Sequence, residues 1–192
     1  MIGRLNSESQ EILINRSTEL IGSMEKDVSR YAPNRHRLWL FHQANLQSPP
    51  ETSEAYFDEF FWKIAQKIYP GCQIALLTFG GKTNEINSDA RIDWHRDHTY
   101  AEETAFGINF GARAEFGYDF HRQAGDRRTI TLQPGDIYKF NCKHTHALLS
   151  HEAQRFSLIL WKIRKDSRYP GLKICEALRA RWRYRISELL AK

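Results

Sequence analysis

Two histidines and an aspartate have the residue types and the spacing of a mononuclear metal site. His95 and Asp97 stand two positions apart at the end of a predicted strand, so their side chains project to the same side of the extended chain. His146 opens a second predicted strand further along. Two imidazoles and one carboxylate on one face of Fe(II) leave adjacent positions open for a chelating 2-oxo acid and for dioxygen. We therefore expect His95, Asp97 and His146 to be the metal ligands and the catalytic centre.

The identity of the distal histidine rests on where the apolar strand begins. His146 is followed by Ala147 and Leu148 and is therefore favoured. His144 and His151 lie close by, and both remain alternatives.

An arginine at the start of the next predicted strand is the candidate for binding an acid. Arg155 is followed by a run in which Phe156 and Leu158 predict burial, and a buried guanidinium needs an anionic partner. Its planar fork matches a carboxylate through two parallel hydrogen bonds. Ser157 lies two residues on, faces the same way, and would add a hydroxyl donor.

These side chains fall within a long stretch that has the two-residue period of β-strands. Between Gln73 and Ile163, short apolar segments alternate with turn residues such as Gly80-Gly81 and Pro134-Gly135. A series of short strands of this kind predicts a barrel or a sandwich. The expected strands are 73–79, 91–95, 104–110, 114–120, 128–132, 136–141, 146–149 and 155–163.

Three helices are expected outside this stretch. Leu13, Leu20, Met24 and Val28 have helical spacing and predict a helix over about 8–30. Residues 48–51, Ser-Pro-Pro-Glu, have the pattern of a capping box for a second helix, which carries an apolar stripe over 57–68 and ends at Pro70-Gly71. A third helix is predicted after residue 169.

The order of the motifs resembles the double-stranded β-helix of the Fe(II)/2-oxoglutarate-dependent dioxygenases. A strand with His-x-Asp, four intervening strands, a strand with His and a strand with Arg follow one another over about residues 73–163. Segments 108–116 and 128–138 resemble the AlkB-like branch of that superfamily.

The resemblance implies a fold, a set of cofactors and roles for the residues. The fold would be α+β, a jelly-roll or cupin-like double-stranded β-helix buttressed by helices, within a single domain spanning 1–192. Fe(II) would be held by His95, Asp97 and His146, while Arg155 and Ser157 would bind the 2-oxoglutarate cosubstrate.

One position departs from the AlkB-like pattern, and three functions therefore stay open. AlkB-like repair enzymes usually carry a second arginine six residues after the first, where this chain has Trp161. This difference favours a dioxygenase that hydroxylates a small molecule or a protein. The alternatives are an AlkB-like oxidative demethylase of nucleic acid and a cupin-like metal-binding protein that does not use 2-oxoglutarate, in which Arg155 would have no purpose.

Composition argues against a membrane, secreted or disulfide-linked protein, and it indicates that nucleic acid could be a partner. No apolar run is long enough to span a bilayer, no secretory signal is recognisable, and Cys72, Cys142 and Cys175 have no disulfide or zinc spacing. We expect a cytoplasmic protein without a membrane partner. Segment 162–192 carries ten basic and three acidic residues, so nucleic acid could bind through the basic C-terminal helix.

Overall fold

The computed structural model describes most of the chain up to residue 164. The described residues are 1–32, 34–45, 51–81, 90–98, 100–120, 126–152 and 154–164, with the backbone alone for 44–45 and 51–53. The predicted C-terminal helix lies outside these residues, as does the basic segment from residue 165 on, and so do Ser48, Pro49 and Pro50.

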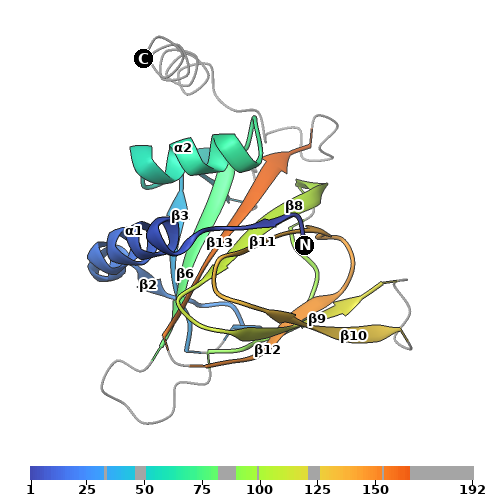
Figure 1. The fold of residues 1–192 in the computed structure, drawn as a ribbon. Helices are drawn as coiled ribbons and strands as arrows, with labels where there is room; N and C mark the ends of the chain where they lie inside the picture. The colour runs from blue at the N-terminus through green and yellow to red at the C-terminus, as the bar shows by residue number, and fades with distance from the viewer. Residues whose placement is uncertain are drawn as a thin grey trace.

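Two antiparallel sheets face one another across the core (Figure 1). The larger has seven strands in the order β1-β11-β8-β13-β6-β3-β2, and the smaller has four in the order β10-β9-β12-β7. The strands of the larger sheet, in that order, are Gly3–Arg4, Asp136–Asn141, Ala101–Phe110, Arg155–Ile163, Ile74–Gly80, His36–Leu40 and Glu25–Lys26. Those of the smaller sheet are Arg127–Leu132, Ala114–Asp119, His146–His151 and Ile92–His95. A separate hairpin pairs β4, His42–Asn45, with β5, Glu51–Glu54.

The predicted strands are present, with ends displaced by a few residues. β8 begins at Ala101, three residues before its predicted start, and β12 continues two residues further, to His151. Two pairs of consecutive strands are divided between the sheets: β8 and β13 pair in the larger sheet, whereas β9 and β12 pair in the smaller one. This is the jelly-roll arrangement of a double-stranded β-helix, so the predicted fold class is confirmed.

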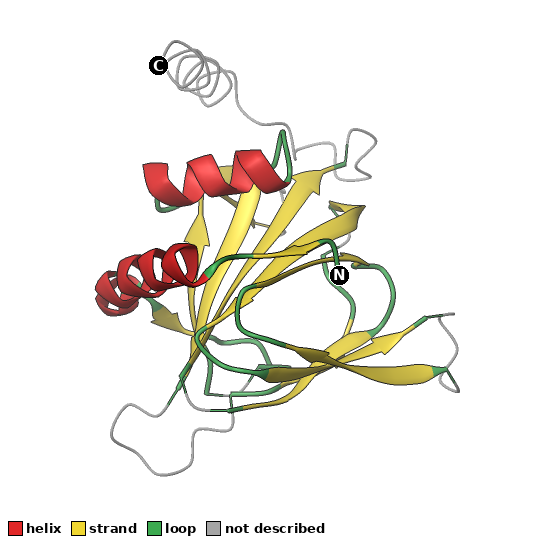
Figure 2. Ribbon diagram, in the orientation of Figure 1, coloured by secondary structure: helices red, strands yellow, loops and turns green. Residues whose placement is uncertain are grey.

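Two helices cover the outer face of the larger sheet (Figure 2). They are α1, Ser7–Glu19, and α2, Glu59–Ile68, and a 3-10 turn, Ile21–Ser23, follows α1. Among the described helices, none is both long and apolar enough to cross a membrane.

Both helices begin at a side chain that accepts a hydrogen bond from a backbone N–H. Asn6 accepts from the backbone of Ser9 at 2.8 Å, and Asp58 accepts from the backbone of Phe61 at 3.1 Å. The capping box predicted around Ser48 is wrong, because Glu51 opens strand β5 and Asp58 is the residue that caps α2.

The N-terminal helix is also shorter than its apolar spacing predicted. It ends at Glu19, and the chain then turns so that β2 pairs with β3 at the sheet edge. Val28, which the helical spacing placed on the buried face, is 84% exposed. Tertiary pairing of residues 25–26 therefore overrides the local helical pattern in this segment.

Alternation along β13 divides the larger sheet into an apolar face and a cavity face. Phe156, Leu158 and Leu160 belong to the core that packs beneath the helices, and each is at most 2% exposed. The residues that alternate with them point to the other face of the sheet. Arg155 and Ser157 are among these, and both line a cavity between the sheets. The two-residue period of the sequence thus sets which side chains face the site.

Candidate metal centre and cavity

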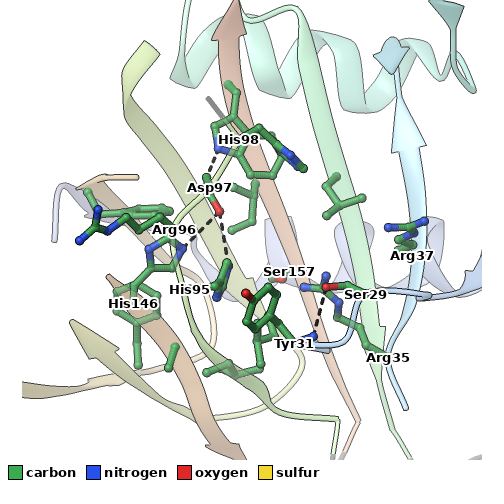
Figure 3. A pocket seen from close by; sticks show the side chains of 18 of the residues that line it. Ser29, Tyr31, Arg35, Arg37, His95, Arg96, Asp97, His98, His146 and Ser157 are labelled. Atoms are coloured by element: carbon green, nitrogen blue, oxygen red, sulfur yellow. Dashed lines mark hydrogen bonds and ion pairs between the residues drawn. The ribbon is translucent and has the colours of Figure 1, made fainter. Parts of the chain in front are cut away.

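Three side chains from β7, the turn after it and β12 meet at one end of the cavity (Figure 3). The ligand atoms of His95, Asp97 and His146 lie within 4.8 Å of one another. Oδ1 of Asp97 is 3.4 Å from Nε2 of His95 and 3.3 Å from Nε2 of His146. The two histidines are direct cross-strand partners on β7 and β12, which places both rings on the same side of the smaller sheet.

Each histidine ring is oriented by a carbonyl two residues before it in the chain. Nδ1 of His95 lies 2.8 Å from the carbonyl oxygen of Asp93, and Nδ1 of His146 lies 2.9 Å from that of His144. An Nδ1–H that donates to a carbonyl leaves Nε2 as the atom with the free lone pair. Both Nε2 atoms therefore lie beside Asp97 with a lone pair that could bind a metal ion.

The charges around Asp97 favour a cation at this position. Burial opposes ionisation of Asp97, but the neighbouring His146 and His95 outweigh it and hold the pKa of the carboxyl below its usual value. Burial also disfavours a charged His146, yet the carboxylate beside it raises the pKa of that imidazole. A set of two imidazole nitrogens and one carboxylate oxygen, with no thiol, has the chemistry of a 2-His-1-carboxylate Fe(II) site. The residues present fit that ion.

The second oxygen of Asp97 is held by a tryptophan. The indole Nε1–H of Trp161 donates to Oδ2 of Asp97 at 2.9 Å, which leaves Oδ1 facing the two imidazoles. Trp161 stands where AlkB-like sequences usually have a second arginine. Its ring lies on the cavity wall, and its contact with the candidate ligand was not predicted.

The two candidate cosubstrate residues lie on the same cavity, on neighbouring inward positions of β13. Arg155 is 5% exposed, and its Nε–H donates to Oδ1 of Asn109 at 2.7 Å. Burial lowers the pKa of Arg155 to about 10, because no carboxylate in the described residues is placed to balance its charge. The hydroxyl of Ser157 is 2.7 Å from that of Thr78 on β6.

Asn109 is a residue of the site to which the sequence motifs assigned no role. Its side-chain amide donates to the carbonyls of Ala112 and Gln133 at 2.8 and 3.1 Å. These bonds fix the amide so that its oxygen faces Arg155. The asparagine is fully buried in β8, where a polar residue needs such partners.

The other two histidines considered as distal ligand lie elsewhere. Nδ1 of His144 is 3.1 Å from the carbonyl oxygen of Asp119, and its ring stacks on Tyr118. Neither His144 nor His151 lines the cavity. His98, for which no role was predicted, does line it and stacks on Tyr100 with ring centres 4.8 Å apart.

The cavity has a volume of about 300 Å³, and one of its walls was not predicted. This wall comes from the segment between α1 and β6, and its lining residues are Ser29, Tyr31, Arg35, Arg37 and Trp39. Tyr31 stacks on His95 with ring centres 6.0 Å apart, and its carbonyl accepts a hydrogen bond from the backbone of Asp93 at 2.7 Å. Only the alternation of Arg37 and Trp39 along β3 could have indicated this wall from the sequence.

This chain is similar to known proteins in its fold, but no match was found from its sequence. No protein-family model and no curated protein sequence matches the chain. Among solved structures, an AlkB homologue, OsALKBH1, superposes with a TM-score of 0.64 at 15% identity, covering 84% of this chain and 96% of that one. This chain has the fold of the 2OG-Fe(II) oxygenases.

Two further solved structures support that assignment of the fold. A 2OG-Fe(II) oxygenase family protein from Burkholderia pseudomallei has a TM-score of 0.56 at 13% identity and covers 83% of this chain and 82% of its own. SnoN, a non-heme alpha-ketoglutarate-dependent epimerase from nogalamycin biosynthesis, has a TM-score of 0.58 at 9% identity, with 83% and 75% covered. The fold therefore extends well beyond the β core in which the sequence resemblance was found.

Proposed function

We propose that this protein is an Fe(II)- and 2-oxoglutarate-dependent dioxygenase that hydroxylates a small-molecule or protein substrate. The observation that carries the proposal is the convergence of His95, Asp97 and His146 at one end of a cavity whose other residues include the buried Arg155. A metal site alone would suit many proteins. A metal site that shares a cavity with a buried arginine, which no carboxylate among the described residues pairs with, suits a protein that also binds an organic acid.

The protein residues have separate tasks in this proposal. His95, Asp97 and His146 would hold the iron, while Trp161 keeps Asp97 turned toward both imidazoles. Arg155 and Ser157 would bind the distal carboxylate of 2-oxoglutarate, and Asn109 keeps the guanidinium in place. Bound iron and 2-oxoglutarate together supply the activation of dioxygen and the oxidation of a substrate C–H bond.

The test is anaerobic addition of Fe(II) and 2-oxoglutarate to the metal-free protein. We expect a visible charge-transfer band that is absent from His95→Ala and that requires a higher 2-oxoglutarate concentration in Arg155→Ala. A band that forms at the wild-type concentration in Arg155→Ala would instead favour a metal-binding protein of the cupin type, in which 2-oxoglutarate is not the cosubstrate.

The second candidate function is oxidative demethylation of nucleic acid. The likeness to OsALKBH1 favours it, and so does the basic segment 162–192, which from residue 165 on lies outside the described residues. It requires the target base to leave its stack and enter the cavity. Demethylation of a methylated oligonucleotide, with a salt dependence that weakens in Arg179→Ala and Arg183→Ala, would establish this function in place of the first.

A further inference from the structure

The unpredicted wall of the cavity carries two arginines that share a single buried carboxylate. Nε and Nη2 of Arg35 both donate to Oδ2 of Asp27, the former at 2.9 Å. Nη1 of Arg37 lies 3.1 Å from Oδ1 of the same aspartate. The side chain of Asp27 is 0% exposed and does not line the cavity, whereas both arginines do. Asp27 therefore holds the two guanidiniums in position from the side that faces away from the cavity.

Asp27 balances only one of the two positive charges. A second carboxylate, Glu25, is 3.0 Å from Nε of Arg37, but its side chain is 60% exposed and its charge is screened by water. Asp97 also raises the pKa of Arg35, but by less than Asp27 does. The guanidiniums themselves are largely withdrawn from solvent, at 13% and 16% side-chain exposure for Arg35 and Arg37. Holding an unbalanced cation in this setting is costly unless an anion arrives.

The charges of the whole cavity point in the same direction. Among the described residues, four arginines line it, namely Arg35, Arg37, Arg96 and Arg155, against one carboxylate, Asp97. Iron and 2-oxoglutarate would not remove this excess, because the two charges of the metal cancel the two carboxylates of the cosubstrate. Burial lowers the pKa of Arg35, and its positive charge also contributes to lowering the pKa of Arg155. A positive potential therefore remains for the substrate.

Apolar side chains extend this cationic wall across the cavity. Trp39 lies next to Arg37 on its strand, with the guanidinium carbon 5.9 Å from the ring centre, and it packs on Trp161 at 6.2 Å between ring centres. Leu76 and Ile159 complete this lining. The wall thus offers a charged end and an apolar surface side by side.

We infer that the substrate is a small organic acid, with an apolar body and a carboxylate or phosphate group bound by Arg35 and Arg37. This inference rests on the proposed function and names the substrate class for that site. The cavity of about 300 Å³ must also admit 2-oxoglutarate, so the substrate is small. Two braced and largely buried guanidiniums suit a compact oxyanion that enters the cavity, because a nucleic-acid backbone is contacted along an exposed surface.

The test measures binding without turnover. The protein is loaded with Zn(II), which has no redox chemistry, and with N-oxalylglycine, an unreactive analogue of 2-oxoglutarate, and binding of the analogue is measured first. The loaded protein is then titrated with benzoate, phenyl phosphate and benzamide, using the fluorescence of the cavity tryptophans Trp39 and Trp161 and calorimetry. Benzamide has nearly the shape of benzoate without its charge, and the two acids separate carboxylate from phosphate recognition.

We expect at least one acid to bind about tenfold or more tightly than benzamide. Arg37→Gln should lower the affinity for that acid about tenfold, and Arg35→Gln should do the same. Arg37→Gln leaves the pair of Arg35 and Asp27 in place, so it answers the question even if Arg35→Gln fails to fold. Arg91→Gln is the matched control: Arg91 pairs with Asp93 at 3.7 Å and is 53% exposed, so its substitution should leave binding unchanged.

Three results would overturn the inference. One is benzamide binding as tightly as both acids, or no binding of either acid. Another is wild-type affinity for the acid in Arg37→Gln. The third is binding of a single-stranded oligonucleotide that depends on Arg37 when neither acid binds. Failure of the wild-type protein to bind N-oxalylglycine would count against the proposed function instead, and loss of that binding in Arg35→Gln alone would assign Arg35 to the cosubstrate.

Discussion

The two faces of the larger sheet are built from alternate residues of the same strands, yet they meet opposite requirements. On the helix face, Phe156 and Leu158 are packed within a continuous apolar core. On the cavity face, Arg155 and Ser157 are equally withdrawn from solvent but keep polar groups directed at an open volume. One face is packed entirely with apolar side chains of the chain, whereas the other leaves charged groups facing the cavity. Substitutions on the two faces should therefore fail in different measurements.

Removal of a candidate ligand should have the largest effect, and it should leave folding intact. Asp97→Ala takes away the oxygen that faces both imidazoles, so we expect metal affinity to fall by more than about 100-fold and hydroxylation to be lost. The metal-free variant should still fold. It loses the hydrogen bond from Trp161 and the favourable contacts with both imidazoles, which lowers its melting temperature, but the desolvation cost of the buried carboxylate disappears as well. Calorimetric titration with Fe(II) or Mn(II) under argon and thermal unfolding measure the two effects. A large loss of stability with unchanged metal affinity would contradict the assignment.

The opposite outcome is expected on the helix face. Leu158→Ala creates a cavity in a fully buried position, so the free energy of unfolding should fall by about 2–5 kcal/mol. Metal affinity of the fraction that remains folded should stay within about twofold of the wild type, since the side chain points away from the site. Chemical denaturation and metal titration test the pair, and a large loss of metal affinity in folded protein would show that the faces are not independent.

Arg155 sharpens the comparison because it is buried like a core residue and charged like a surface residue. Arg155→Met should weaken 2-oxoglutarate binding about 100-fold, because a charge-assisted contact with the distal carboxylate is lost. The free energy of unfolding should fall by no more than about 1 kcal/mol, since removal of an unbalanced buried cation offsets the lost hydrogen bond to Asn109. Cosubstrate titration and denaturation of the same sample measure both. A severe loss of stability would mean that the arginine serves the fold rather than a ligand.

A smaller effect is expected from the tryptophan that holds Asp97. Trp161→Phe keeps an aromatic ring but removes the N–H donor at 2.9 Å, so metal affinity should fall about tenfold, with a shift of the charge-transfer band. Trp94→Phe is the matched control, since Trp94 lies 4.3 Å from the guanidinium of Arg127 and does not line the cavity. Equal effects of the two substitutions would show that Trp161 acts through packing alone.

The smallest effect concerns a titrating residue away from the cavity. Burial lowers the pKa of His42, and this is partly offset by the carbonyl of Gln73 and the charge of Glu54, its cross-strand neighbour. A histidine with a lowered pKa adds stability that is present above its unfolded pKa of about 6.5 and is lost as the pH falls below it. The free energy of unfolding should therefore fall less between pH 7 and pH 5 in His42→Gln than in the wild type. The difference between the two falls should be at most about 1 kcal/mol. Denaturation curves at the two pH values measure this, and an equal fall in both proteins would contradict it.

The sequence predicted the parts of the molecule whose local pattern and tertiary role agree. His-x-Asp at a strand end, the two-residue period and the position of Arg155 gave the sheets and a convergent set of side chains, and the fold class is confirmed. The roles of these side chains and the single domain remain predictions. The wall around Arg35 was missed because Leu13, Leu20, Met24 and Val28 kept a helical spacing, whereas β2 pairing and the buried Asp27 shape that segment. Such distant pairings leave no periodic trace in the sequence.

The carbonyls that orient the two histidines carry a consequence for how this protein can diversify. Each ring is hydrogen-bonded to a backbone carbonyl two residues before it, within β7 for His95 and just before β12 for His146, and neither bond comes from Arg37 or Trp39. Residues such as Arg37 and Trp39 can therefore be exchanged without disturbing either imidazole. The candidate metal centre and the cavity wall can therefore change independently of one another in sequence.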